Sequence, residues 1–203
     1  MDTQIPSGEP MKFLDRPLAF TDLEMTGLQP THYASGTFQP WHEICEIGLV
    51  LADPHTLDIL DTLDIKVRPD RMALADPKAL AVNGYDEKEW RDAKSLYDAL
   101  TLFNHKAAGA VLIAHNVTFD GAFLDAAYAM TGIQSLLDYH RLDLLSIAKA
   151  IAEAKGYSLE KIGLSRVAEF LGLHGEEHPH RAVNGAKLAY EVYKKLYGLP
   201  VKS

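Results

Sequence analysis

The chain has 203 residues, of which 47% are hydrophobic and 24% are charged, and its formal net charge is −8. This length suits one compact domain with a sizeable core, and the composition is that of an ordinary globular protein. The acidic balance argues against a broad surface that tracks nucleic-acid phosphates, but it leaves room for a small site that holds phosphates through metal ions.

Residues 1–16 are polar and contain two prolines and a glycine. We expect them to form a flexible leader, followed by a single domain over residues 17–203. Cys45 is the only cysteine, which excludes an internal disulfide, and we expect it to be a buried strand residue. Because no apolar run could span a membrane and the start lacks a secretion signal, we expect a cytoplasmic protein without a membrane partner.

The first part of the domain shows strand patterns. Residues 17–23 form a short apolar run, residues 42–53 repeat it with some ambiguity, and residues 56–69 alternate in two runs. Three consecutive strands joined by turns are most simply antiparallel. The intervening segment 26–41 is rich in Gly, Pro, Ser and Thr and has no period, so we expect a loop there.

The second part alternates helices with short apolar strands. Strands are expected at 109–116 and 138–143. Helices are expected at residues 76–84, 92–107, 118–132, 144–156, 163–173 and from about His180 onward. This alternation predicts parallel strands in the second half, and therefore one mixed α/β domain.

Asp22 and Glu24 stand two residues apart on the first predicted strand, so both side chains point to the same face. Two such carboxylates repel each other unless a cation lies between them, and ligands made only of oxygen suit Mg²⁺ or Mn²⁺ rather than Zn²⁺. Taken alone, the pair is explained equally well as two solvent-facing acids on an edge strand.

The stretch "LIAHNVTFD" predicts an apolar strand, a short polar turn, and then Asp120 in the first turn of a helix. His115 and Asn116 lie at the end of the strand, a place where sites often form in α/β folds. A structural explanation stays open here too, because the helix dipole favours a carboxylate at Asp120 and backbone groups could satisfy His115 and Asn116.

His180 precedes the last helix, and Gly185 lies on the edge of its apolar stripe, facing the rest of the domain. That stripe is formed by Ala182, Ala186, Ala189, Val192 and Leu196. The preceding "LHGEEHPH" holds three histidines and two glutamates, but its spacing fits no common zinc pattern and favours an exposed polar loop.

Together, "FTDLEMTGL", "AHNVTFD" and "HRAVNG" resemble the three motifs of the DEDDh 3′–5′ exonucleases, in order and approximate spacing. That family includes ribonuclease T, oligoribonuclease and the proofreading subunit of bacterial DNA polymerase III. The resemblance spans roughly residues 17–197, and the third motif is only half matched. It implies a ribonuclease H-like fold, in which helices flank a mixed five-stranded sheet.

The resemblance also implies roles for single residues. Asp22, Glu24 and Asp120 match acids that bind two divalent ions, and His180 matches the general base that deprotonates the attacking water. An imidazole changes charge near neutral pH, which suits this task. The implied reaction is hydrolysis of phosphodiester bonds at the 3′ end of DNA or RNA by a two-metal mechanism, releasing nucleoside 5′-monophosphates. The positions that match substrate-binding residues are Met25, Thr26, Gly27, Leu28, His115, Asn116 and Phe119.

Gly185 departs from the family pattern, which has an acid five residues after the histidine. Without that acid, one of the two expected Mg²⁺ or Mn²⁺ ions loses a protein ligand and is expected to bind more weakly. Asn184 is adjacent, but a shift of one helical residue turns the side chain by about 100°.

Two functions stay open on the sequence. The first is a metal-dependent 3′–5′ exonuclease of single-stranded DNA or RNA, with activity reduced by Gly185. The second is a catalytically impaired relative that binds 3′ ends or a protein partner. A plain structural domain is disfavoured by three motifs in the right order, and we favour the enzyme because the base His180 is retained. A homodimer and association with a polymerase are both compatible with the resemblance.

Overall fold

The computed structural model describes residues 12–34, 37–198 and 200, and its centre is a five-stranded sheet with strand order β5-β4-β1-β6-β7. The strands are β1 (Leu18–Met25), β4 (Ile44–Ala52), β5 (Ile59–Lys66), β6 (Val111–Ala114) and β7 (Arg141–Asp143). β1, β4 and β5 pair antiparallel, whereas β6 is parallel to β1 and β7 is parallel to β6. The predicted mixed five-stranded sheet is therefore confirmed.

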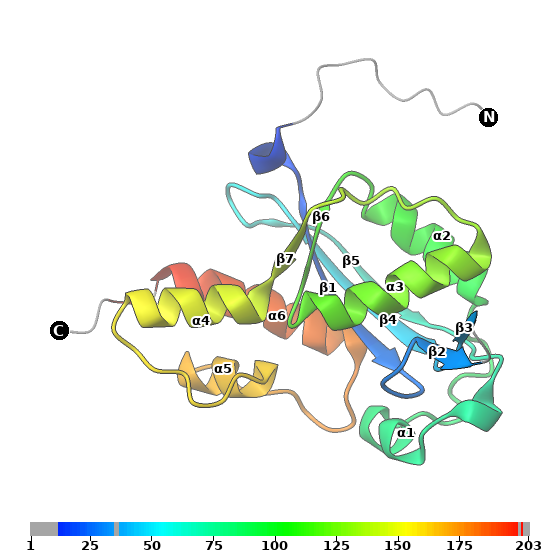
Figure 1. Ribbon diagram of the computed structural model, residues 1–203. Helices are drawn as coiled ribbons and strands as arrows, with labels where there is room; N and C mark the ends of the chain where they lie inside the picture. Colours follow the sequence, from blue (N-terminus) through cyan, green and yellow to red (C-terminus); the bar gives the residue numbers. More distant parts are fainter. Residues whose placement is uncertain (1–11, 35–36, 199, 201–203) are drawn as a thin grey trace.

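Helices cover both faces of this sheet (Figure 1). One face packs against α2 (Leu96–Lys106) and α3 (Val117–Thr131). The other face packs against α4 (Leu144–Ala154), α5 (Leu164–Phe170) and α6 (Ala182–Gly198). The short helix α1 (Pro77–Asn83) begins after the cap Asp76, with Pro77 in its first turn as the sequence predicts, and it contacts β1.

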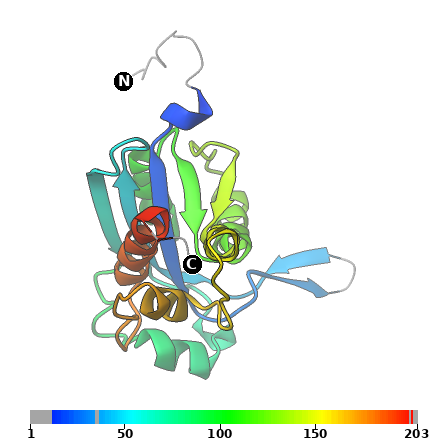
Figure 2. The ribbon, with the colours of Figure 1, turned by 90° about the vertical axis from the view of Figure 1, so that its left-hand side faces the viewer.

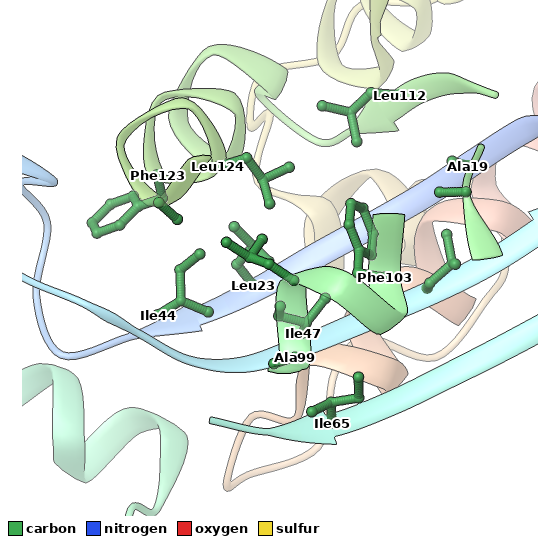
Figure 3. Packing of buried hydrophobic residues seen from close by; sticks show 14 of the residues in the cluster. Ala19, Leu23, Ile44, Ile47, Ile65, Ala99, Phe103, Leu112, Phe123 and Leu124 are labelled. Carbon is green, nitrogen blue, oxygen red and sulfur yellow. The ribbon is translucent and has the colours of Figure 1, made fainter. Parts of the chain in front are cut away.

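The side chains of β1 point alternately to the two faces of the sheet, and each face has its own hydrophobic core. Ala19 and Leu23 join the core under α2 and α3, where Phe103 and Phe123 fill much of the space (Figure 3). Phe20 points the other way and makes edge contacts with Tyr190 and Tyr193 of α6 at centroid distances of 5.5 and 5.2 Å. Since side chains two apart share a face, the even-numbered residues of β1 face α6.

The prediction of a loop over residues 26–41 is wrong in part. Thr31–Ala34 (β2) and Thr37–Pro40 (β3) pair antiparallel as a separate two-stranded sheet. Figure 2 shows this hairpin projecting away from the main sheet. Its sequence lacks the regular hydrophobic alternation by which strands are recognised, and its two strands pair with each other rather than with the main sheet.

Smaller features complete the chain. Of the predicted leader, residues 1–11 lie outside the described residues, and Phe13–Asp15 form a short 3-10 turn (η1). A second 3-10 turn (η2) covers Met72–Leu74. No helix among the described residues is long and apolar enough to cross a membrane.

Candidate active site

The two acids of β1 lie under the first turn of α6. In the antiparallel register, Asp22 is opposite Gly48 and Glu24 is opposite Glu46, both of β4. A Cβ added to Gly48 would overlap the backbone of Ala182, so the glycine is what allows α6 to start directly over the sheet. This close approach brings the beginning of α6 beside Asp22.

Asp120 joins the same region from α3. It is 4% exposed, and its carboxylate accepts a hydrogen bond from the Leu23 N–H at 3.2 Å, which ties the first turn of α3 to β1. The turn before it is held by Asp143, whose Oδ1 accepts from the N–H groups of Asn116 (2.9 Å) and Val117 (3.1 Å). Asp143 therefore fixes where Asp120 enters the site.

His180 is held through the backbone on both sides. Its own N–H donates to the Val82 carbonyl at 3.0 Å, which links it to α1. The next residue, Arg181, donates to the Asn83 carbonyl at 2.6 Å and pairs with buried Glu46 at 3.4 Å. Glu46 also accepts from the N–H of Ala182 at 3.1 Å, so a single carboxylate fixes the start of α6.

These elements surround a hollow of about 450 Å³. Three of the four predicted catalytic residues, Asp22, Glu24 and His180, line it, whereas Asp120 is buried next to it and is not part of the lining. The other lining residues are Leu23, Met25, Gly27, Leu28, Asp76, Lys78, Ala79, Val82, Phe119 and Glu176. The structure thus brings together the acid pair of the first motif and the histidine of the third.

Burial raises the pKa of each acid, and repulsion by neighbouring acids adds to this effect for Asp22 and Glu24. For Glu24, burial and then the charge of Glu46 raise the pKa to about 8, with smaller effects from Glu176 and Asp120. Burial raises the pKa of Asp120 to about 7. Burial and then the charge of Asp120 raise the pKa of Asp22 well above its ordinary value. Clustered acids with raised pKa values are typical of functional sites.

The donor set suits a hard divalent cation. Glu24 is only 9% exposed, and no described residue donates a hydrogen bond to, or forms an ion pair with, the carboxylate of Glu24 or Asp22. Oxygen ligands of this kind are those preferred by Mg²⁺ and Mn²⁺. As placed, no three His, Cys, Asp or Glu side chains of the described residues are close enough to hold one ion. A cation would have to draw the acids together.

Gly185 lies in α6, buried beside Asp22. A Cβ added at this position would lie 2.6 Å from Cγ of Asp22, so the carboxyl group of Asp22 occupies the space from which a side chain at 185 would start. The stripe that the sequence predicts for this helix is buried, as expected. An acid introduced at 185 would therefore require Asp22 to rotate.

The residues predicted to bind substrate separate into two groups. Met25, Gly27, Leu28 and Phe119 line the hollow, and Leu28 is 69% exposed. Thr26 is instead buried, and its hydroxyl accepts from the Glu43 N–H at 2.8 Å, which holds the end of β1 against β4.

His115 and Asn116 do not line the hollow. Nε2 of His115 lies 2.5 Å from the Ile162 carbonyl, while its buried Nδ1 has no partner among the described residues. Burial lowers the pKa of His115. Asn116 is exposed in a left-handed conformation (φ 69°), which asparagine tolerates better than most residues.

Sequence reasoning missed three acids that shape this site: Glu46, Asp143 and Glu176. Glu46 could have been recognised, because a single acid interrupts the apolar strand "ICEIGLVLA". In the structure this acid is 1% exposed. Asp143 also carries one, since an aspartate directly before a helical period is a cap signature. Glu176 belongs to a polar loop, and only the tertiary structure brings it to the hollow.

Similarity to known proteins identifies an exonuclease family. The exonuclease family RNase T matches residues 19–193. The chain is 30% identical over 199 residues to a PolC-type DNA polymerase III of Caldanaerobacter subterraneus subsp. tengcongensis, covering 97% of this chain but 13% of that protein. It is 26% identical over 180 residues to the DNA polymerase III subunit epsilon of Escherichia coli, and the match covers 87% of this chain and 70% of that protein. The nuclease domain of 3′hExo, a DEDDh family member bound to rAMP, superimposes with a TM-score of 0.64 at 18% identity. This superposition covers 92% of this chain and 96% of that domain.

Proposed function

Because the chain belongs to the RNase T family of DEDDh-type exonucleases, we propose that it removes nucleotides from the 3′ end of single-stranded DNA or RNA. The proposed products are nucleoside 5′-monophosphates. The observation that carries the proposal is the shared hollow, in which Asp22 and Glu24 meet His180 although the motifs lie more than 150 residues apart.

We assign the binding of two divalent cations, Mg²⁺ or Mn²⁺, to Asp22, Glu24 and Asp120. When bound, such ions neutralise the charge that develops on a phosphodiester under attack. The fit rests on the unpartnered carboxylates of Asp22 and Glu24 and on their oxygen-only chemistry.

The other residues act on the water and on the terminal nucleotide. His180 accepts a proton from the attacking water, and the backbone bond to Val82 and the contacts of Arg181 hold it at the wall of the hollow. Leu28 and Phe119 offer an apolar surface against which the last base would stack. The charge of −8 leaves little cationic surface, which favours a short single-stranded substrate.

A second candidate function is the binding of 3′ ends without hydrolysis, and Gly185 is the observation that favours it. An association with a replicative polymerase is a further proposal, supported by the names of the PolC and epsilon relatives. The chain spans 13% of the PolC-type protein, so that whole protein's activity is not carried over.

The deciding experiment follows the shortening of single-stranded DNA and RNA oligonucleotides, labelled at either end, with Mg²⁺ and with Mn²⁺. We expect stepwise loss from the 3′ end, and a rate at least about 100-fold lower in Asp22→Ala, because the lost ligand costs several kcal/mol in the transition state. The variant of exposed Asp92, Asp92→Ala, serves as the matched control and should retain the wild-type rate.

Hydrolysis that survives in Asp22→Ala would refute the site assignment. If the wild type leaves every oligonucleotide intact while Gly185→Asp shortens them, the chain is a binding module and the proposed hydrolysis is wrong.

A further inference from the structure

The first turn of α6 contributes no carboxylate beside the acid pair, Asp22 and Glu24. Gly185 is the residue that approaches Asp22 from this helix, and it offers no ligand atom. Glu24 is 9% exposed and lines the hollow, and none of the described residues donates a hydrogen bond to its carboxylate or forms an ion pair with it. Burying a charged carboxylate without a partner costs free energy. A cation bound in the hollow would offset this cost, and it would need further ligands to complete its coordination shell.

Glu176 reaches this hollow from the loop between α5 and α6. It lines the hollow together with Asp22, Glu24 and His180, and no described residue forms a hydrogen bond or ion pair with its carboxylate. Figure 1 shows that loop leaving α5 and approaching α1 before it enters α6. Glu176 also borders a second hollow, lined by Asn184 and Lys187 on the outer side of α6. It therefore stands at the first turns of α6, the part of the helix that carries Gly185.

The backbone of this loop is fixed, which makes the placement of Glu176 specific. The N–H of Glu176 donates to Oγ of Ser165 at 3.0 Å. Gly175 packs so closely on Ser165 that an added Cβ would lie 2.9 Å from the serine Cβ. Helix α5 thus holds the residue at a set position while its side chain stays free to turn inward.

Other polar residues nearby are less suited to the task. Glu46 is already engaged by Arg181 and by the N–H of Ala182. Asn184 is exposed and lines the second hollow rather than the first, and Glu177, next to Glu176, is exposed and also faces the second hollow.

We propose that Glu176 supplies a carboxylate to the divalent cation held by Asp22 and Glu24, in place of the acid that position 185 lacks. This inference rests on the proposed function for the presence of the cation. The ligand comes from a loop outside the helix, so the α6 backbone can stay close to Asp22 while the number of acids at the site is preserved.

The test measures Mn²⁺ binding to the full chain by electron paramagnetic resonance, without nucleic acid. In Glu176→Gln we expect the dissociation constant to rise at least about tenfold, the scale on which even indirect contacts to a metal act. The matched control is Glu177→Gln, which should bind within about twofold of wild type because Glu177 lines the second hollow and not the one that holds Asp22 and Glu24. Circular dichroism establishes that each variant is folded.

Rescue distinguishes a ligand from a general electrostatic effect. In the double variant Glu176→Gln/Gly185→Asp, we expect Mn²⁺ affinity to return to within about threefold of wild type, once Asp22 rotates away from position 185. Unchanged Mn²⁺ binding in Glu176→Gln would overturn the inference. A loss that the double variant does not recover would overturn the claim that Glu176 replaces an acid at 185.

Failure of this inference and failure of the proposed function give different results. A wild type that binds Mn²⁺ through Glu176 but shortens no oligonucleotide refutes the function and keeps the ligand. Oligonucleotide hydrolysis by a Glu176→Gln variant with wild-type Mn²⁺ affinity refutes the ligand and keeps the function.

Discussion

Burial and neighbouring acids raise the pKa of Glu24 from its ordinary value of 4.5 to about 8. Between these two pH values, Glu24 of the folded, metal-free protein therefore keeps a proton that the unfolded chain has already released. The free energy of unfolding must then fall as the pH rises from about 4.5 to about 8, because the folded state is the one that binds more protons. The site that suits a cation destabilises the fold when no cation is present.

This conflict predicts that Glu24→Gln stabilises the metal-free protein. A glutamine cannot ionise, so above pH 8 the variant should exceed wild type by about 2–4 kcal/mol in free energy of unfolding, and at pH 5 the two should nearly coincide. Urea unfolding in EDTA at several pH values measures both quantities. Saturating Mn²⁺ should reverse the order, because only the wild type keeps the ligand.

The control for this prediction is Glu160→Gln, a change at an exposed glutamate that should show no such pH dependence. Equal stabilities of wild type and Glu24→Gln at pH 9 without metal would mean that the carboxylate is solvated and that the acids do not repel each other as described.

At the scale of secondary-structure elements, Asp143 links the starts of two helices, α3 and α4. Its carboxylate caps α4 through the Ser146 N–H at 3.1 Å and also accepts from Asn116 and Val117 at the start of α3. Because it serves two helix starts, Asp143→Ala should lower the free energy of unfolding by about 2–3 kcal/mol at pH 7, roughly twice the usual effect of one cap. Asp92→Ala, at an exposed residue, provides the comparison.

The pH dependence of this cap has a defined sign. Burial alone would raise the pKa of Asp143, but hydrogen bonds from Ser146, Val117 and Asn116 outweigh it and hold the pKa below its ordinary 3.8. The stabilisation is therefore complete above pH 3.8 and is lost as the pH falls through the lower folded value. Urea unfolding should show the gap between wild type and Asp143→Ala narrowing below pH 3.8. A constant gap would show that the carboxylate charge is not what caps the helices.

The contact between β4 and α6 leads to a prediction about Gly48. A methyl group there would overlap the Ala182 backbone, so Gly48→Ala must push the start of α6, and His180 with it, away from Asp22. We expect a loss of about 1–3 kcal/mol in free energy of unfolding from overpacking, together with slower oligonucleotide hydrolysis. Gly198→Ala adds the same methyl group where nothing lies within 4 Å and should change stability by less than about 0.5 kcal/mol. Wild-type stability in Gly48→Ala would show that the helix start yields freely.

Elements with a local signal could be predicted from the sequence, and those without one could not. The strand that carries Asp22 and Glu24 was predictable because alternation fixes which side chains share a face. The hairpin of β2 and β3 was not, since its strands pair only with each other and the segment shows no regular hydrophobic alternation. The second predicted helix begins at Leu96 after its cap Ser95. Lys94 lies opposite Val67 in an isolated parallel bridge and bonds to the backbone of Lys66 and Arg68, which keeps residues 92–94 out of the helix.

For the whole molecule, the order of the motifs sufficed to predict the fold, but not the full set of acids at the site. Asp22, Glu24 and His180 were found because each lies in a recognisable local pattern. Glu46 reaches the start of α6 only after β4 pairs with β1, and Glu176 reaches the hollow only after α5 fixes its loop. Such contacts join residues whose sequence spacing carries no period.

The acidic charge of the whole chain predicts weak dependence of binding on salt. Among the described residues that line the hollow, Lys78 is the one Lys or Arg, and nearby Arg181 is engaged by Glu46 and Glu89. Each phosphate neutralised on a single strand contributes about −0.7 to the slope of log affinity against log salt concentration, so few contacts mean a slope shallower than about −2. The measurement is fluorescence anisotropy of an oligonucleotide with phosphorothioate linkages at its 3′ end, in Mn²⁺, over a range of salt concentrations. Lys78→Ala should flatten the slope by less than about 1, whereas Lys149→Ala, on the distant helix α4, should leave it unchanged. A slope of −5 or steeper would mean that the protein tracks a long phosphate backbone, against the short single-stranded substrate inferred from its charge.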